Sequence, residues 1–244
     1  MEHEDSYSFD SRVDMHTPLL PTGLTSEQVM GECAFFSCEL DFALAHTDDL
    51  GKEILEAMGY NSAFQDEMER VKRGERLVFV DSWANSMTRN QSGSPYGFHL
   101  DGAKKDPQTK KADLKTLDKN NGRMFLCLVG DDKGVSSTDF IHDRLHVPRS
   151  AIGRVNPWAD LHQFTRKHLT RTTRRPLPYG QIATYSGQTI HSASRTNLRE
   201  GAKRHTRRLT RVSFLDSNSG ITPLNELRDP DWMQARDVDP KWVY

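Results

Sequence analysis

From Arg76 onward the sequence consists of short runs rich in β-branched and aromatic residues, separated by Gly, Pro, Asn and Asp. This pattern predicts a β-sandwich or barrel, because alternating βαβ units would place long helical patterns between the strands. About eight runs can be counted, and eight strands suit a jelly roll. We expect strands at residues 77–83, 96–100, 124–129, 139–142, 151–155, 181–185, 189–192 and 209–215.

The part of the chain that precedes these runs has helical periodicity. A capping box at residues 25–28 is followed by apolar residues at helical spacing, which predicts a helix over residues 26–45. Two shorter helices are predicted at residues 48–58 and 61–73, because each begins with a residue that caps helices well. The sequence therefore indicates a mostly β protein with N-terminal helices.

The expected organisation is one domain over residues 17–244, preceded by a flexible tail at residues 1–16. A chain of 244 residues is long enough to bury a substantial core within a single domain. In that domain, residues 25–73 would support a barrel core of residues 76–216, and residues 217–244 would form a C-terminal segment.

Composition and simple motifs exclude several classes of protein. No apolar run approaches the roughly 18 residues that span a bilayer, and the acidic N-terminus differs from a secretory signal, so a cytoplasmic protein is expected. The three cysteines lack CxxC spacing, which argues against a disulfide framework and against a structural zinc site. The absence of a nucleophile elbow and of a P-loop removes the usual support for a hydrolase or an NTPase.

Charge is strongly segregated along the chain, although the formal net charge is only −1. Residues 1–70 hold 3 basic and 16 acidic side chains, whereas residues 144–211 hold 15 basic and 2 acidic ones. The two segments could pack together and neutralise each other, or the basic segment could bind an anionic ligand. Residues 103–122, with six lysines and no apolar periodicity, predict an exposed loop or a lid.

Three His-x-Asp tripeptides occur, beginning at His3, His46 and His99, and about one is expected by chance. Only His99 lies in a predicted strand, at its end, where alternation would point His99 and Asp101 to the same face. His191 follows a predicted strand and turn, and is the candidate for a third ligand. Two histidines and one carboxylate are the ligand set of non-haem Fe(II) sites that keep three positions open.

The last predicted strand carries a second polar pair. Arg211 and Ser213 share one face of this strand, and Val212 and Phe214 take the other, so the arginine and the serine should project into the barrel. A buried arginine needs an anionic partner, and no acidic side chain lies nearby in sequence.

The order and strand context of five residues carry a family resemblance: His99, Asp101, His191, Arg211 and Ser213. Over residues 77–216 the chain resembles the Fe(II)/2-oxoglutarate-dependent oxygenases. The resemblance implies a double-stranded β-helix, a cupin-like jelly roll, with Fe(II) bound by the two histidines and the aspartate. It also implies 2-oxoglutarate and O2 as cosubstrates, with the far carboxylate of 2-oxoglutarate on the arginine and serine.

The spacing of the late residues leaves the cosubstrate contacts open. The interval between His191 and Arg211 is longer than in many family members, so Arg207 or Arg208 could bind the carboxylate instead. Arg207 shares the strand face of Arg211, whereas Arg208 does not. Asn85, on the first predicted strand, is a further candidate for contact with cosubstrate or substrate.

The resemblance implies hydroxylation of a substrate with release of succinate and CO2. Surplus arginines favour a small anionic or zwitterionic substrate, such as an amino acid or a nucleotide-like compound, and the enzyme is expected to be a monomer or homodimer. The alternative is a non-catalytic β-sandwich module that binds an acidic partner or nucleic acid through residues 144–211. Nucleic acid is the less favoured ligand, because aromatic residues for base stacking are sparse in this segment.

Overall fold

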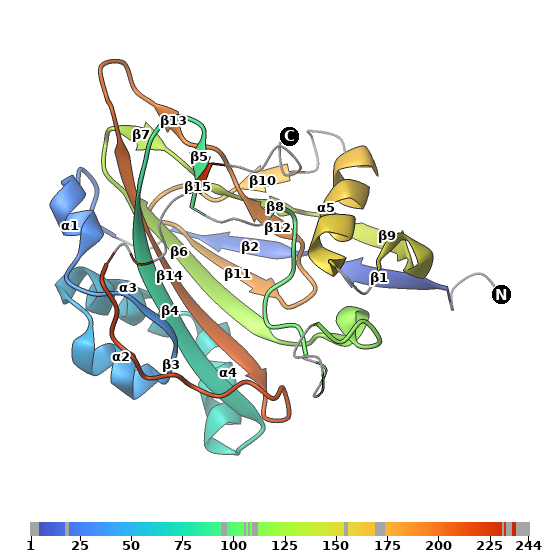
Figure 1. The fold of residues 1–244 in the computed structure, drawn as a ribbon. Coiled ribbons are helices and arrows are strands. Elements are labelled where there is room, and N and C mark those ends of the chain that lie inside the picture. Colours follow the sequence, from blue (N-terminus) through green and yellow to red (C-terminus); the bar gives the residue numbers. More distant parts are fainter. Residues whose placement is uncertain are drawn as a thin grey trace.

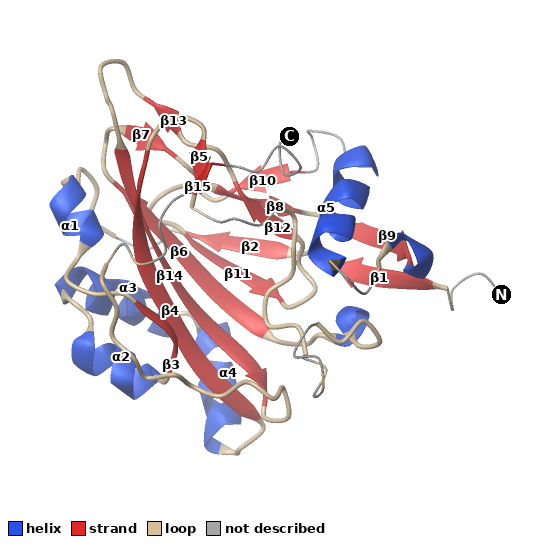
Figure 2. Ribbon diagram, viewed as in Figure 1, coloured by secondary structure: helices blue, strands red, loops and turns tan. Residues whose placement is uncertain are grey.

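The fold consists mainly of antiparallel strands, with the N-terminal helices gathered on one side (Figures 1 and 2). The computed structural model describes residues 5–17, 20–93, 97–104, 106, 108, 112–153, 156–168, 174–230, 232 and 236–237. The described part contains no helix that is long and apolar enough to cross a membrane.

The largest sheet has six antiparallel strands in the order β2-β11-β6-β14-β4-β3. In that order the strands are Val13–His16, Ile182–Ser186, Arg123–Gly130, His205–Asp216, Arg76–Met87 and Phe35–Cys38. The two longest strands, β14 and β4, pair along their whole length and place Arg211 opposite Asp81.

A smaller sheet of three antiparallel strands lies against one face of the large sheet (Figure 1). It contains β10 (Arg174–Pro176), β8 (Thr138–Ile141) and β12 (His191–Ala193). Phe140 of β8 belongs to a buried cluster with Phe79 and Leu126 of the large sheet, so apolar side chains fill the space between the sheets. This double-layered arrangement confirms the predicted jelly-roll fold, mostly β with N-terminal helices.

Three further strand pairs extend this framework. Their strands are β1 (Ser6–Asp10) with β9 (Arg144–Pro148), β7 (Gly134–Val135) with β13 (Asn197–Leu198), and β5 (Gln91–Ser92) with β15 (Arg236–Asp237). Among the described residues, the other helices are α5 (Pro157–His168) and the short 3-10 turns η1 (Leu117–Lys119) and η2 (Arg149–Ala151).

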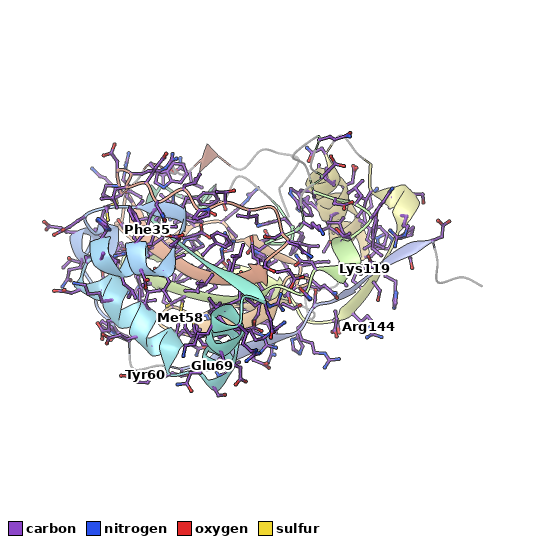
Figure 3. All side chains as sticks on the ribbon, turned by 90° about the horizontal axis from the view of Figure 1, so that it is seen from below. Phe35, Met58, Tyr60, Glu69, Lys119 and Arg144 are labelled. Atoms are coloured by element: carbon purple, nitrogen blue, oxygen red, sulfur yellow. The ribbon has the colours of Figure 1, made fainter. Side chains whose placement is uncertain are left out.

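Four helices cover the outer face of the large sheet. They are α1 (Ser26–Met30), α2 (Leu40–His46), α3 (Asp49–Gly59) and α4 (Ser62–Lys72). Met58 and Phe64 from this layer pack against Val212 and Phe214 of β14. Seen from below, the labelled Met58, Tyr60 and Glu69 lie on the helical side, and Lys119 and Arg144 lie at the opposite end (Figure 3). Val212 and Phe214 of β14 thus face the helices, and residues of the opposite parity, such as Arg211, face the interior.

The helical predictions were correct for α3 and α4, which begin after Asp48 and Asn61 as expected. The single helix predicted over residues 26–45 was wrong. The capping box does start α1, but Gly31 ends it with φ +69°, a left-handed conformation that favours glycine. The chain then forms β3 before it returns to helix in α2.

The tail predicted at residues 1–16 was also wrong for the residues that the structure describes. Residues 6–10 and 13–16 form β1 and β2, and Phe9 and Val13 are buried. Alternating apolar residues anchor this segment, although polar residues dominate its composition.

The strand predicted at residues 151–155 was wrong for the residues that the structure describes there. They begin in the turn η2 and do not form a strand.

Candidate metal centre

The two candidate histidines lie side by side on neighbouring, paired segments of the chain. His99 and His191 form an antiparallel bridge in which each backbone N–H donates to the other residue's carbonyl, at 2.9 and 3.1 Å. Such a hydrogen-bonded pair holds the two Cα atoms about 5.5 Å apart. The ring centroids are 4.5 Å apart, so the imidazoles project to the same side.

Asp101 completes this set, as alternation along the chain predicted. Its Oδ2 lies 3.0 Å from His191 Nε2, and its Oδ1 lies 3.9 Å from His99 Nε2. One ligand atom from each of the three residues lies within 4.8 Å of the others. All three side chains are largely buried.

The hydrogen bonds of the two histidines leave one nitrogen of each ring available to bind a metal. His99 Nδ1 lies 2.7 Å from Gly97 O and His191 Nδ1 lies 3.0 Å from Thr189 O, so we assign the proton to each Nδ1. Each Nε2 then presents a lone pair towards Asp101, the arrangement that metal-binding histidines usually show. Burial, aided by nearby His191, lowers the pKa of His99 to about 4, which keeps this ring neutral at physiological pH. These residues therefore fit a divalent transition metal.

The carboxylate of Asp101 is held from both sides. Tyr185 donates its hydroxyl to Oδ2 at 2.8 Å, and Arg211 Nη1 lies 2.5 Å from Oδ1. Burial alone would raise the pKa of Asp101, but Arg211 and His191 more than offset this effect and hold it well below its ordinary value. Burial raises the pKa of Tyr185, so its hydroxyl remains a donor.

Asn120 ties together the two chain segments that carry the ligands. Its side-chain amide donates to Asp101 O at 2.8 Å and to Gly187 O at 3.0 Å. A Cβ at Gly187 would lie 2.3 Å from Asn120, so this close approach explains the glycine in the turn before His191. On the other side, His162 of α5 accepts the N–H of Phe98 at 3.0 Å.

Arg211 faces the interior as predicted, but it already has anionic partners. Its Nε and Nη2 donate to Asp81 Oδ2 at 2.9 and 2.6 Å, in addition to the contact with Asp101. The partner is Asp81, which is remote in sequence but directly opposite on β4. Ser213 faces the interior two residues beyond Arg211, on the side away from Arg207.

Arg208 lies on the opposite face of β14, under the helices. It donates to both carboxylate oxygens of Asp48, at 2.8 and 2.7 Å, and to Ser82 on β4. This pair joins the acidic N-terminal segment to the basic segment, in line with one of the two explanations for the segregated charge. Arg208 therefore cannot reach a ligand in the barrel.

Arg207 is the buried arginine that lacks a carboxylate. It is 1% exposed and donates only from Nη1 in the described contacts, to the carbonyls of Ser136 and Ser137 and to the Ser136 hydroxyl. Its Nε has no hydrogen-bond partner among the residues that the structure describes. Burial accordingly lowers its pKa. An uncompensated buried guanidinium indicates a site for an anion.

Asn85 and Gly93 adjoin this guanidinium. Asn85 is opposite Arg207 on β4, and a Cβ at Gly93 would lie 2.2 Å from Arg207 Nη2 and 2.9 Å from Asn85 Oδ1.

Sequence reasoning missed Gly93, Asp81, Tyr185 and Asn120. The predicted metal triad comes together in the structure, whereas His142 and His146 are exposed and lie outside it.

A hydrogen-bonded Tyr-His-Asp chain, in which the histidine and the aspartate are buried, lies beside Arg207. Tyr179 Oη is 2.5 Å from His205 Nε2, and His205 Nδ1 is 2.7 Å from Asp131 Oδ1. Tyr179 also accepts the N–H of Ser136, the residue whose carbonyl binds Arg207. The chain therefore anchors the wall that holds the guanidinium.

This chain predicts a pH dependence of stability. Burial lowers the pKa of His205, so below its ordinary pKa of 6.5 the unfolded state binds a proton that the folded state does not. The free energy of unfolding should therefore fall as the pH drops below about 6.5, with a slope of up to about 1.4 kcal/mol per unit from this group. Urea unfolding at pH 7.5 and 5.5 should show a smaller drop for His205→Gln than for the wild type. An equal drop in both proteins would contradict the assignment.

Comparisons with known proteins show a distant similarity of fold. The chain matches no protein-family model and no curated protein. Among solved structures, a non-heme monooxygenase in a nickel complex, ThoJ, is 12% identical with a TM-score of 0.37, over 83% of this chain and 73% of that one. EvdO2 from Micromonospora carbonacea var. aurantiaca, complexed with 2-oxoglutarate, is 12% identical with a TM-score of 0.36, over 92% and 93%. An oxidoreductase of the 2OG-Fe(II) oxygenase family from Burkholderia pseudomallei is 12% identical with a TM-score of 0.32, over 85% and 74%. Similarities this weak assign no activity.

Proposed function

We propose that the protein is a non-haem Fe(II)/2-oxoglutarate-dependent oxygenase. The observation that carries the proposal is the convergence of His99 Nε2, His191 Nε2 and the Asp101 carboxylate inside the barrel, with both Nδ1 atoms held by backbone carbonyls. These three residues would hold the metal. Bound Fe(II) would supply O2 activation, coupled to conversion of 2-oxoglutarate to succinate and CO2 and to hydroxylation of the substrate.

Arg207 is the proposed partner for the far carboxylate of 2-oxoglutarate. This assignment replaces the expected contact with Arg211 and Ser213, because Arg211 is already paired with two carboxylates. Arg207 is on the same face of β14, about 13 Å along the strand from Arg211, and its guanidinium lacks an anionic partner among the described residues. Asn85 would provide a further polar contact beside it.

The charges of the site support this pairing. Asp81, Arg211 and Asp101 together carry one negative charge, to which a divalent metal adds two positive charges and Arg207 one more. A 2-oxoglutarate dianion would bring the sum to zero. Neutralisation of this kind matters because uncompensated charge in a buried site is costly.

We further propose a small anionic or zwitterionic substrate, such as an amino acid or a nucleotide-like compound. Arg166, Lys167 and His168 are exposed at the end of α5, the helix whose His162 supports the segment of His99. Arg175 is exposed on β10, and its register partner Phe140 also pairs with His191. These cations favour a negatively charged ligand.

Anaerobic addition of Fe(II) and 2-oxoglutarate tests the proposal. The complex should give a weak visible charge-transfer band that appears only when both are present. No band, together with binding of a polyanion that weakens steeply with salt, would instead favour a non-catalytic binding module.

A further inference from the structure

Arg211 bridges two aspartates that come from different parts of the barrel. Its Nε and Nη2 bind Asp81 Oδ2, and its Nη1 binds Asp101 Oδ1. A guanidinium is planar and presents its donors in a fixed fork, so fixing one edge also fixes the direction of the remaining N–H groups. The orientation of Arg211 towards Asp101 therefore depends on Asp81.

Asp81 is itself held in place by the neighbouring edge strand β3. Its Oδ1 accepts the N–H of Ser37 at 2.7 Å, which leaves Oδ2 for Arg211. Ser37 belongs to the irregular part of β3 and has φ +55°, an uncommon conformation for a residue other than glycine. The strained residue directs its amide at a carboxylate that is 3% exposed, which is consistent with a functional constraint on this contact.

The charges of Asp81, Arg211 and Asp101 also affect how strongly the site binds a cation. With Asp81 present, the guanidinium is compensated, and Asp101 keeps the negative charge that a metal needs. Without Asp81, Arg211 would place an uncompensated positive charge beside the ligand set, 2.5 Å from the carboxylate. Both effects, loss of orientation and loss of compensation, would weaken metal binding.

We infer that Asp81 is a positioning residue for the metal centre: through Arg211 it orients the Asp101 carboxylate and keeps its charge available for a divalent cation. This inference rests on the proposed metal site. It assigns a role to a residue 20 positions before Asp101, on a strand that carries no ligand.

The opposite face of β14 provides a matched pair for a control experiment. Arg208 and Asp48 form an ion pair at 2.7 Å, similar to the 2.6 Å contact of Arg211 with Asp81. Both pairs are largely buried, but Arg208 faces the helices. An Asp→Asn change at either position removes a comparable ion pair, and only one of them lies next to the metal ligands.

Titration with Co(II), a divalent stand-in for Fe(II), tests the inference without measuring turnover. We expect Asp81→Asn to raise the Kd for Co(II) roughly 10- to 100-fold, the usual effect of losing a group that orients a ligand. Asp48→Asn should change this Kd less than about twofold, even if it lowers the thermal midpoint as much. Arg211→Lys, which keeps the charge but not the fork, should also weaken Co(II) binding.

The outcomes separate this inference from the proposed function. Wild-type protein that binds no Co(II) would overturn the metal site itself. Wild-type binding with an unchanged Kd in Asp81→Asn would leave the metal site intact and overturn the role of Asp81. If Asp81→Asn does not fold, Arg211→Lys decides the matter, and an unchanged Kd in that variant would overturn the inference.

Discussion

The Asp101→Ala variant should lose 2-oxoglutarate turnover almost completely, by at least roughly 10³-fold, because the acceleration of the reaction depends on the metal. Removal of this carboxylate takes away one of three ligands and the only ionised one. It also leaves Arg211 with a single anionic partner next to two histidines, which opposes a cation further. Succinate formation with Fe(II) and ascorbate present is the measurement.

Two controls make this result interpretable. Asp14→Ala removes an exposed aspartate from β2 and should retain wild-type turnover. Circular dichroism should show that Asp101→Ala keeps the β-rich fold, since the apolar core between the sheets does not include Asp101. Wild-type turnover in folded Asp101→Ala would exclude Asp101 as an essential ligand.

Arg207→Met should separate cosubstrate binding from folding. Loss of a buried, charge-assisted contact with a carboxylate costs about 2–5 kcal/mol. The Kd for 2-oxoglutarate should therefore increase by a factor between roughly 30 and several thousand. Without ligand, the thermal midpoint should equal or exceed that of the wild type, because the variant removes a buried cation that lacks a carboxylate partner in the described structure. The stabilisation that 2-oxoglutarate gives the wild type should disappear.

Thermal melts with and without 2-oxoglutarate, in the presence of a divalent metal, provide both measurements for this variant. Arg208→Met is the matched control, because it removes an equally buried arginine from the opposite face of β14. It should lower the midpoint by breaking the pair with Asp48, yet keep the shift that 2-oxoglutarate causes. An unchanged Kd in Arg207→Met would show that another residue binds the carboxylate.

Local alternation correctly predicted the faces of Arg211, Val212 and Phe214 on β14. The apolar residues Val212 and Phe214 pack against the helices, and Arg211 faces the interior, as the pattern requires. The strand itself begins at His205, before the predicted start, because its polar first residues find partners inside the fold. A prediction based on the pattern of hydrophobic residues therefore underestimates the length of such a strand.

The partners of these residues could not be predicted from local patterns. Asp81 pairs with Arg211 across 130 residues of sequence, and such pairing depends on strand register in the folded sheet. One signal was available: Asp81 interrupts an apolar strand at an inward position, and a buried carboxylate requires a cationic partner or strong donors. Strand parity alone made Arg211 and Arg207 equal candidates for binding the 2-oxoglutarate carboxylate. Only their contacts in the folded structure distinguish the two arginines.

The N-terminal region shows the same limitation. Residues 6–16 have few apolar side chains, but their strands pair with β9 and β11, which come much later in the chain. The predicted helix over residues 26–45 failed for a local reason, since Gly31 was available as a stop signal within it. The convergence of His99, Asp101 and His191, the proposed metal ligands, was predictable because residue type, order and alternation all agreed.

Metal content is the most direct test of the central claim, the site formed by His99, Asp101 and His191. The protein is purified without a histidine tag, loaded anaerobically with Fe(II) and freed of excess metal before analysis. We predict one iron per chain in the wild type and in His142→Ala/His146→Ala, and none in His191→Ala or Asp101→Ala. Iron that is absent from the wild type, or that persists at one per chain after loss of His191 or Asp101, would contradict the account.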